Sequence, residues 1–417
     1  MTLLETVFVI ALAAKLLAEL VLDALNRAQV AKNAKSMPPA LEGIMSEEKF
    51  QKANEYTLVK SKFGTIGLLL DAAILAVVIL SGVLPQAFEA WSSTFGDASW
   101  SSALFLVVVM MALSLPGLPL EYWEQFKIEE RFGFNRSTKG LWIGDKIKGT
   151  LVGLVIGFPL LWLLISLVGW LGDSWWIWGF GIMFGFQLVM MVLYPMLIIP
   201  LFNKLTPLED GPLRSRLMAM SDKAGFKCNA IQVIDGSKRS AHSNAYFTGF
   251  GKFRRIVLYD TLIEQLGEEE IEAVLAHEIG HYKKGHIPKM IASSAAMMFA
   301  GFWIIGYLAN NEAFFHGFGF EQTSIGIAFL LFGLVGGLFT FWMTPLFNIL
   351  SRKHEYEADA FARDVVGDWK PLSNALRSLS EKNLSNLQPH PAYSGFHYSH
   401  PTLLEREAAM AGEGARS

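Results

Sequence analysis

Apolar and polar residues follow one another along the chain in long blocks, and seven of the apolar blocks could cross a membrane. A spanning helix needs about 20 mostly apolar residues. The blocks lie at 3–25, 64–84, 103–120, 151–170, 175–199, 287–308 and 324–350. We therefore expect seven membrane-spanning helices. The first block lacks the basic start and the cleavage motif of a signal peptide, so we expect it to be retained.

The first apolar block is interrupted by charged residues. Lys15, Glu19 and Asp23 are spaced four residues apart, so they share one face of a helix. They could form a self-paired stripe near the membrane surface. They could equally form a face turned toward a water-filled interior, and the sequence leaves both interpretations open.

The segments that connect the apolar blocks differ in their basic residues. The odd-numbered connections, at 26–63, 121–150 and 200–286, hold seven, six and twelve Lys or Arg residues, and the others hold none. The positive-inside rule then places the N-terminus outside, and the large connection at 200–286 and the C-terminal tail in the cytosol. No dilysine or KDEL-like retrieval motif occurs in the tail. This favours a bacterial inner membrane, and a eukaryotic source would indicate the endoplasmic reticulum.

The same blocks divide the chain into four regions. Residues 1–200 hold the first five predicted membrane helices and their loops, and 287–350 hold the last two. Residues 201–286 and 351–417 form two polar regions that meet on the cytosolic side. We expect an all-α membrane protein with a mainly helical cytosolic domain.

Composition supports a membrane protein and excludes other classes. Of the 417 residues, 52% are hydrophobic and only 18% are charged, against roughly 25% charged in soluble domains. The net charge of −3 gives no basic field, so we expect a lipid bilayer as partner and no nucleic acid. The single cysteine, Cys228, excludes an internal disulfide and a cysteine-based metal site.

One stretch, LAHEIGHYKKGH at 275–286, has the pattern of a zinc site. His277 and His281 are four residues apart, so on a helix both can bind one ion. Glu278 lies one step around the helix, where it could take a proton from the attacking water. Ordinary helix histidines are the alternative, but the spacing favours a single Zn²⁺ ion. His286 is unassigned and expected to be structural.

A catalytic zinc ion usually has three protein ligands, so one remains to be found. The last two predicted membrane helices leave the membrane surface and return to it. They bring SRKHEYEADAFARD, at 351–364, back to the side of the two histidines. Glu355 and Asp359 share a helix face there, and Glu357 points away. One of the pair could bind metal while the other anchors a ligand histidine, and the pattern does not decide which.

Five motifs in a fixed order relate the chain to a known family. They are KIEERFGFNRST (127–138), HSNAYFTGFGKFRRIVLYDTL (242–262), HEIGH (277–281), SRKHEYEADAFA (351–362) and YSHPTLLER (398–406). With these motifs and its predicted helices, the chain resembles the type I CAAX prenyl proteases, which are seven-span membrane zinc endopeptidases. The HtpX-type stress proteases share the zinc motifs. They have fewer spans and lack IEERFGFN, so the chain resembles them less.

The resemblance implies a role for individual residues and an overall fold. Glu355 would be the third zinc ligand, and Asp359 would support the ligands from behind. His400 and Arg406, at the HPxxxxR positions, would border the active site and help stabilise the oxyanion. The family fold is a ring of seven helices that encloses a large water-filled chamber, with the zinc ion at its cytosolic end.

Two β-branched segments predict a small sheet beside the zinc motif. They are IQVID at 231–235 and RIVLYD at 255–260, and a hairpin is expected around 249–252. An edge strand can bind an extended peptide by adding it to the sheet. In the family that the chain resembles, the HSNA segment does this, so Asn244 is the expected substrate contact. A plain surface hairpin is the alternative.

Together these patterns predict a monomeric integral-membrane zinc metalloendopeptidase. Glu278 would take a proton from the attacking water and deliver it to the departing amine. The resemblance implies that the leading substrate is the C-terminal part of a prenylated CAAX-type protein, whose prenyl chain would need an apolar passage from the bilayer. One alternative is an HtpX-type quality-control protease with the same chemistry. Another is a channel or transporter with structural zinc, which would normally have four His or Cys ligands.

Overall fold

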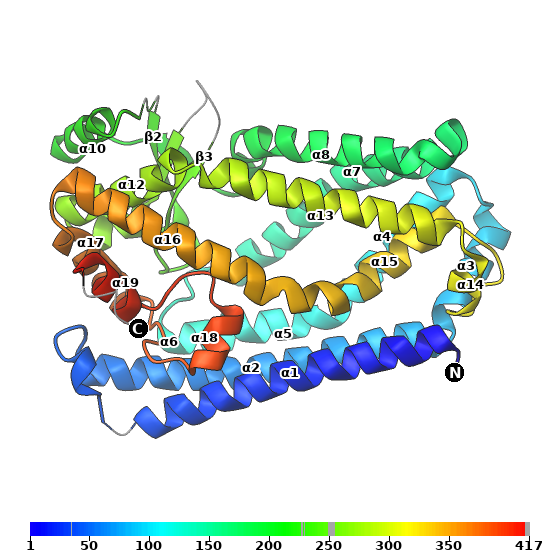
Figure 1. The fold of residues 1–417 in the computed structure, drawn as a ribbon, viewed down its shortest axis with the longest axis horizontal. Coiled ribbons are helices and arrows are strands. Elements are labelled where there is room, and N and C mark those ends of the chain that lie inside the picture. The colour runs from blue at the N-terminus through cyan, green and yellow to red at the C-terminus, as the bar shows by residue number, and fades with distance from the viewer. Residues whose placement is uncertain (35, 227, 229, 249–254, 413–417) are drawn as a thin grey trace.

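Helices make up most of the computed structural model, which describes all residues except 35, 227, 229, 249–254 and 413–417. Figure 1 shows the long helices running along the longest axis of the molecule. The sheet and several shorter helices gather at one end, and the N-terminus lies at the other.

The helices of the first half are α1 (Leu3–Asn33), α2 (Glu47–Leu80), α3 (Val83–Phe95), α4 (Ser99–Ser114), α5 (Leu118–Trp123), α6 (Glu130–Phe132), α7 (Lys139–Leu171), α8 (Trp175–Leu193) and α9 (Ile199–Phe202). Those of the second half are α10 (Pro212–Lys223), α11 (Asp260–Gln265), α12 (Glu268–Lys283), α13 (His286–Ala309), α14 (Glu312–His316), α15 (Ile325–Thr340), α16 (Thr344–Val366), α17 (Lys370–Lys382), α18 (Pro391–His397) and α19 (Leu403–Met410).

Five helical segments in the described part of the chain are long and apolar enough to cross a membrane. They are Glu47–Leu80, Ser99–Phe132, Lys139–Phe202, His286–Ala309 and Ile325–Val366. The third contains two of the predicted spans, because the 3₁₀ turn Gly172–Ser174 separates α7 from α8. The charged helix α1 is not among the five. The helical membrane fold is therefore confirmed, and the count of seven spans stays a prediction.

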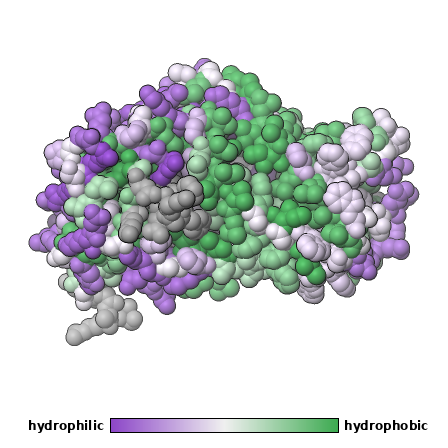
Figure 2. Space-filling view, turned by 90° about the horizontal axis from the view of Figure 1, so that it is seen from above, coloured by the Kyte–Doolittle hydropathy of each residue, from purple (hydrophilic) through white to green (hydrophobic). Residues whose placement is uncertain are grey.

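The surface matches a membrane location. Figure 2 shows a broad hydrophobic surface between two polar ends. Large apolar side chains such as Val155, Trp162 and Trp303 lie exposed on the long helices. In water such a surface would favour aggregation. In a bilayer, the hydrocarbon chains of the lipids cover it, so the apolar side chains are not exposed to water.

The charged face of α1 lines a cavity between the helices. Lys15 and Glu19 form an ion pair of 2.9 Å. With Asp71 of α2 and Leu338 of α15, they line a space of about 310 Å³. Lys15 and Glu19 therefore pair with each other and also line this cavity, and the position of the stripe relative to the membrane and to water stays a prediction.

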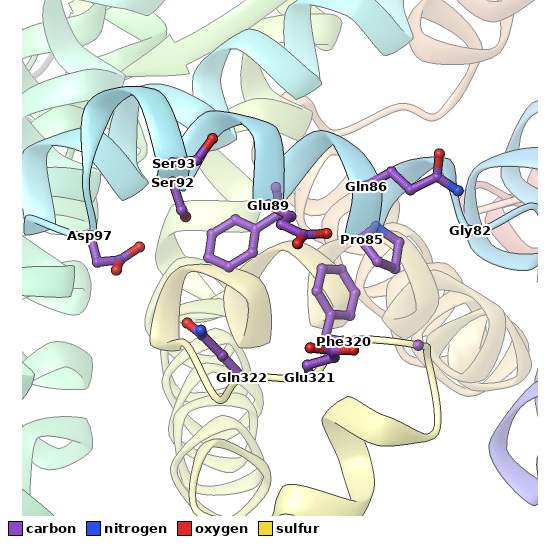
Figure 3. A pocket seen from close by; sticks show the side chains of 12 residues that line it. Gly82, Pro85, Gln86, Glu89, Ser92, Ser93, Asp97, Phe320, Glu321 and Gln322 are labelled. Atoms are coloured by element: carbon purple, nitrogen blue, oxygen red, sulfur yellow. The ribbon is translucent and has the colours of Figure 1, made fainter.

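A further cavity lies at the end of the molecule far from the sheet. Helix α3 and the loop before α15 line a space of about 500 Å³. Glu89, Asp97 and Glu321 place three carboxylates around it (Figure 3). This acidic end contrasts with the end that holds the sheet, where most of the basic connections lie.

Four short strands form one mixed sheet beside α12. The strands are β1 (Leu205–Pro207), β2 (Ala230–Ile234), β3 (Ala245–Thr248) and β4 (Arg255–Tyr259), in the order β1-β2-β4-β3. β2 and β4 are parallel, and the two outer pairs are antiparallel. Both predicted strands are confirmed. The turn expected at 249–252 lies outside the described residues.

The edge strand β3 and a hydrophobic core hold the two polar regions of the chain around α12. β3 packs against α12. One hydrophobic core contains Leu217 of α10, Leu275 of α12, Ala362 of α16 and Met410 of α19. Two polar regions that are far apart in the sequence therefore share a single core.

Candidate metal centre

Helix α12 carries the two histidines of the HEIGH motif. Its first turn is acidic, and the Gly267 N–H donates to the Glu270 carboxylate at 2.9 Å, which stabilises the helix start. Ile271, Leu275 and Ile279 are fully buried on its apolar face. The histidines therefore occupy a different face of α12, toward α16.

Gly280 lets α12 lie close to α16. A Cβ atom at this position would be 3.0 Å from the Cα atom of Ala358 and 3.1 Å from its carbonyl oxygen. Backbone atoms cannot rotate away as a side chain can, so a larger residue would separate the helices. The close approach brings Glu355 of α16 opposite the histidines.

Donor atoms of three residues on the two helices converge. The Nε2 atoms of His277 and His281 are 3.1 Å apart. Glu355 Oε2 lies 3.4 Å from His277 Nε2, and Glu355 Oε1 lies 3.2 Å from His281 Nε2. Tetrahedral zinc ligands with bonds of about 2.0–2.2 Å lie roughly 3.3 Å from one another. The spacing therefore fits one ion of this size, and the three residues form a candidate metal group.

The burial of Glu355 supports the same conclusion. Its residue is 4% exposed, and its Oε2 atom is buried without a hydrogen bond in the described part of the chain. An ionised oxygen left in this state is destabilising, and a bound cation removes that penalty.

The electrostatics around His277 favour positive charge. Burial lowers the pKa of His277, but its hydrogen bond to Asp359 and its contact with Glu355 outweigh this effect and raise the pKa to about 9. The two carboxylates therefore stabilise a cation at this point, whether a proton or a metal ion.

Asp359 links His277 to Arg406. Asp359 Oδ1 lies 2.8 Å from His277 Nδ1, and the Nε atom of Arg406 donates to Oδ2 at 2.8 Å. Because Nδ1 donates to Asp359, the lone pair of the neutral ring, which is the form that binds a metal ion, lies at Nε2 toward the other ligand residues. Arg406 is buried, and its Nη1 atom lies 3.5 Å from Glu355 Oε2.

Glu278 and His400 border the donor group without belonging to it. Burial raises the pKa of Glu278, so its carboxylate takes up a proton more readily than an exposed glutamate. His400 Nε2 lies 3.4 Å from Glu355 Oε1, and the His400 side chain is 63% exposed. The site therefore has one half-buried proton acceptor and one accessible imidazole.

Asn244 occupies a different place. It lies directly before β3 and is exposed, and its side-chain oxygen accepts a hydrogen bond from the Ala245 N–H at 2.8 Å. The other predicted site residues gather around the donor group. Asn244 instead marks the start of the edge strand.

Comparison with known proteins decides the family. A family model described as "CAAX prenyl protease N-terminal, five membrane helices" matches residues 27–204, and one for peptidase family M48 matches residues 207–413. CAAX prenyl protease 1 of Saccharomyces cerevisiae is 38% identical over 407 residues, covering 90% of this chain and 88% of that protein. The chain belongs to the CAAX prenyl protease family. The human CAAX prenyl protease 1 homolog is 32% identical over 429 residues, with 92% and 90% covered.

A match to a solved structure supports the assignment of this chain to the CAAX prenyl protease family. The crystal structure of S. mikatae Ste24p has a TM-score of 0.89 and 35% identity, and the match covers 97% of this chain and 98% of that one. Membership in peptidase family M48 confirms a membrane metallopeptidase and argues against a transporter. The match to residues 27–204 favours this family over the shorter HtpX type.

Two residues near the donor group were not predicted to belong to the site. His286 Nδ1 lies 2.9 Å from His281 Nδ1, and His286 Nε2 lies 2.9 Å from Glu357 Oε2. His286 follows Gly285, where α12 ends and α13 begins. Because helical spacing does not extend across this break, the sequence pattern gave no sign of the contact.

Proposed function

We propose that this membrane metallopeptidase uses one zinc ion to cleave near the C-terminus of prenylated CAAX-type proteins. His277, His281 and Glu355 would hold the ion, since two nitrogen donors and one carboxylate are typical of catalytic zinc. The observation that carries the proposal is the convergence of these donors beside the half-buried carboxylate of Glu278, whose pKa is raised by desolvation.

The reaction requires a base and groups that stabilise negative charge. Zinc, when bound, polarises the peptide carbonyl and lowers the pKa of the attacking water to about 7. Glu278 accepts a proton from that water and delivers it to the departing amine. His400 and Arg406 stabilise the negative charge that develops on the carbonyl oxygen. Asp359 holds both His277 and Arg406 in place.

The peptide would bind along β3. β3 is at the edge of the sheet and packs against α12. An extended peptide added to this edge would run past the metal centre, with main-chain hydrogen bonds supplying most of the affinity. Asn244, exposed at the start of the strand, would contact the substrate.

An apolar cavity beside β3 would receive the prenyl chain. Its volume is about 880 Å³, within the range of about 300–1,000 Å³ for small-ligand pockets. α8 and α13 form its membrane side, with Met183, Met190 and Met298 among its lining residues. Tyr246 of β3 lines the same cavity, and its hydroxyl is buried without a hydrogen-bond partner in the described residues. The strand and the cavity are thus contiguous.

The proposal includes an arrangement in the membrane. α1 would be the first of seven spans around a water-filled chamber, with α7 and α8 as separate spans. The N-terminus would lie outside, and residues 201–286 and 351–417 would act as one cytosolic catalytic unit of a monomer. The membrane would be the inner membrane in a bacterium or the endoplasmic reticulum in a eukaryote.

Cleavage of matched peptides tests the substrate. We expect a farnesylated CAAX peptide to be cleaved with a kcat/KM at least about tenfold above that of the unfarnesylated peptide, because the chain buries its apolar surface in the cavity. Met190→Trp, which fills the cavity, should reduce this preference, whereas Met290→Trp should not, since Met290 is 64% exposed on α13. Equal cleavage of both peptides would instead favour an HtpX-type quality-control protease.

A further inference from the structure

His286 contacts a proposed metal ligand from behind. It is 1% exposed, and its two ring nitrogens have different partners. Nδ1 lies 2.9 Å from Nδ1 of His281, and Nε2 lies 2.9 Å from the carboxylate of Glu357. The ring of His354 stacks on its face, with centroids 4.0 Å apart and an angle of 14°.

These contacts determine where the hydrogens lie. An ionised carboxylate only accepts hydrogen bonds, so His286 Nε2 must donate to Glu357. The neutral His286 ring then has a lone pair at Nδ1. His281 Nδ1 must therefore carry the hydrogen and donate to His286. This leaves the lone pair of His281 at Nε2, the atom that lies 3.2 Å from Glu355 Oε1.

We propose that Glu357 and His286 are positioning residues that fix His281 in the tautomer able to bind the metal ion. The inference rests on the proposed metal centre. Asp359 does the same for His277 directly, through the contact at Nδ1. Each ligand histidine is thus controlled by a carboxylate of α16, one in direct contact and the other through His286.

The turn between α12 and α13 makes the contact between His286 and His281 possible. Gly285 has a φ of +69°, a left-handed conformation that ends α12 and starts α13. The turn places His286 beside His281 although helical spacing would separate them. Glu357 lies one turn or less from both Glu355 and Asp359 on α16, on the side away from the donor group.

Substitutions at His286 separate the tautomer role from packing. His286→Phe keeps a ring to stack on His354 but removes the acceptor. Its zinc affinity, measured by chelator competition, should fall about 10–100-fold, as for other partners of metal-bound histidines. His286→Asn offers an amide oxygen near the Nδ1 position and should recover most of the affinity. The unfolding midpoint of the metal-free protein shows whether each variant is folded.

A second pair of variants tests Glu357, the carboxylate that accepts from His286. Glu357→Ala should weaken zinc binding, whereas Glu357→Gln should stay within about threefold of the unchanged protein, because its amide oxygen still accepts from His286. His354→Phe is the matched control, since it retains the stacked ring, and should leave the affinity unchanged.

Two results would overturn the inference. One is unchanged zinc affinity in His286→Phe. The other is an equal loss in His286→Phe and His286→Asn, which would indicate packing alone. In both cases the unchanged protein would still bind zinc tightly. Failure of the unchanged protein to bind zinc would overturn the proposed metal centre as well.

Discussion

Glu278→Gln is expected to bind zinc as tightly as the unchanged protein and to lose peptide hydrolysis by about 10²–10⁴-fold. Glutamine has nearly the same size and shape, so α12 and its histidines should keep their positions. The amide cannot accept the proton of the attacking water. Single-turnover cleavage of a farnesylated peptide, together with zinc content per molecule, measures both parts of the expectation.

A control on the same helix separates this effect from a general change in α12. Glu269→Gln alters an exposed residue of the first turn and should leave hydrolysis and zinc content unchanged. Appreciable hydrolysis by Glu278→Gln would show that another group is the base. Loss of zinc would instead show that Glu278 is a ligand.

Glu355→Ala is expected to abolish zinc binding at working concentrations and, with it, hydrolysis. Removal of a direct ligand should weaken the affinity by more than the roughly 10–100-fold typical of residues that only support a ligand. Only His277 and His281 would remain, and two ligands rarely hold catalytic zinc. Chelator competition and the same cleavage assay provide the measurements.

Asp364→Ala is the matched control on α16. Asp364 is an exposed carboxylate that pairs with Arg363, so this variant should bind zinc and cleave normally. If Glu355→Ala retained zinc while Asp359→Ala lost it, Asp359 would be the third metal ligand and Glu355 the residue that supports it. The sequence pattern by itself left that exchange open.

The local part of the metal centre could be predicted from the sequence. His277 and His281 have a spacing that any α-helix converts into a shared face. The return of the last membrane helices also indicated where to find a third ligand. The choice of Glu355 over Asp359 depends on how closely α12 and α16 approach, and Gly280 permits that approach through a contact with Ala358. Such a distance between helices is not encoded in the spacing of either one.

Features that depend on breaks between elements were harder to predict. His286 reaches His281 across the turn at Gly285, where the period of 3.6 residues no longer applies. For the charged residues of α1, too, the sequence predicted only part of the arrangement. Their spacing placed Lys15 and Glu19 on one face, but only packing against α2 and α15 determines that this face lines a cavity.

Removal and return of metal tests the central claim most directly. Purified protein is treated with a chelator and dialysed, and hydrolysis of a farnesylated CAAX peptide is followed as zinc is added back. We expect no hydrolysis without metal and full recovery at one zinc ion per molecule, with no recovery in Glu355→Ala. Full hydrolysis by protein whose measured zinc content is negligible would contradict a zinc peptidase mechanism.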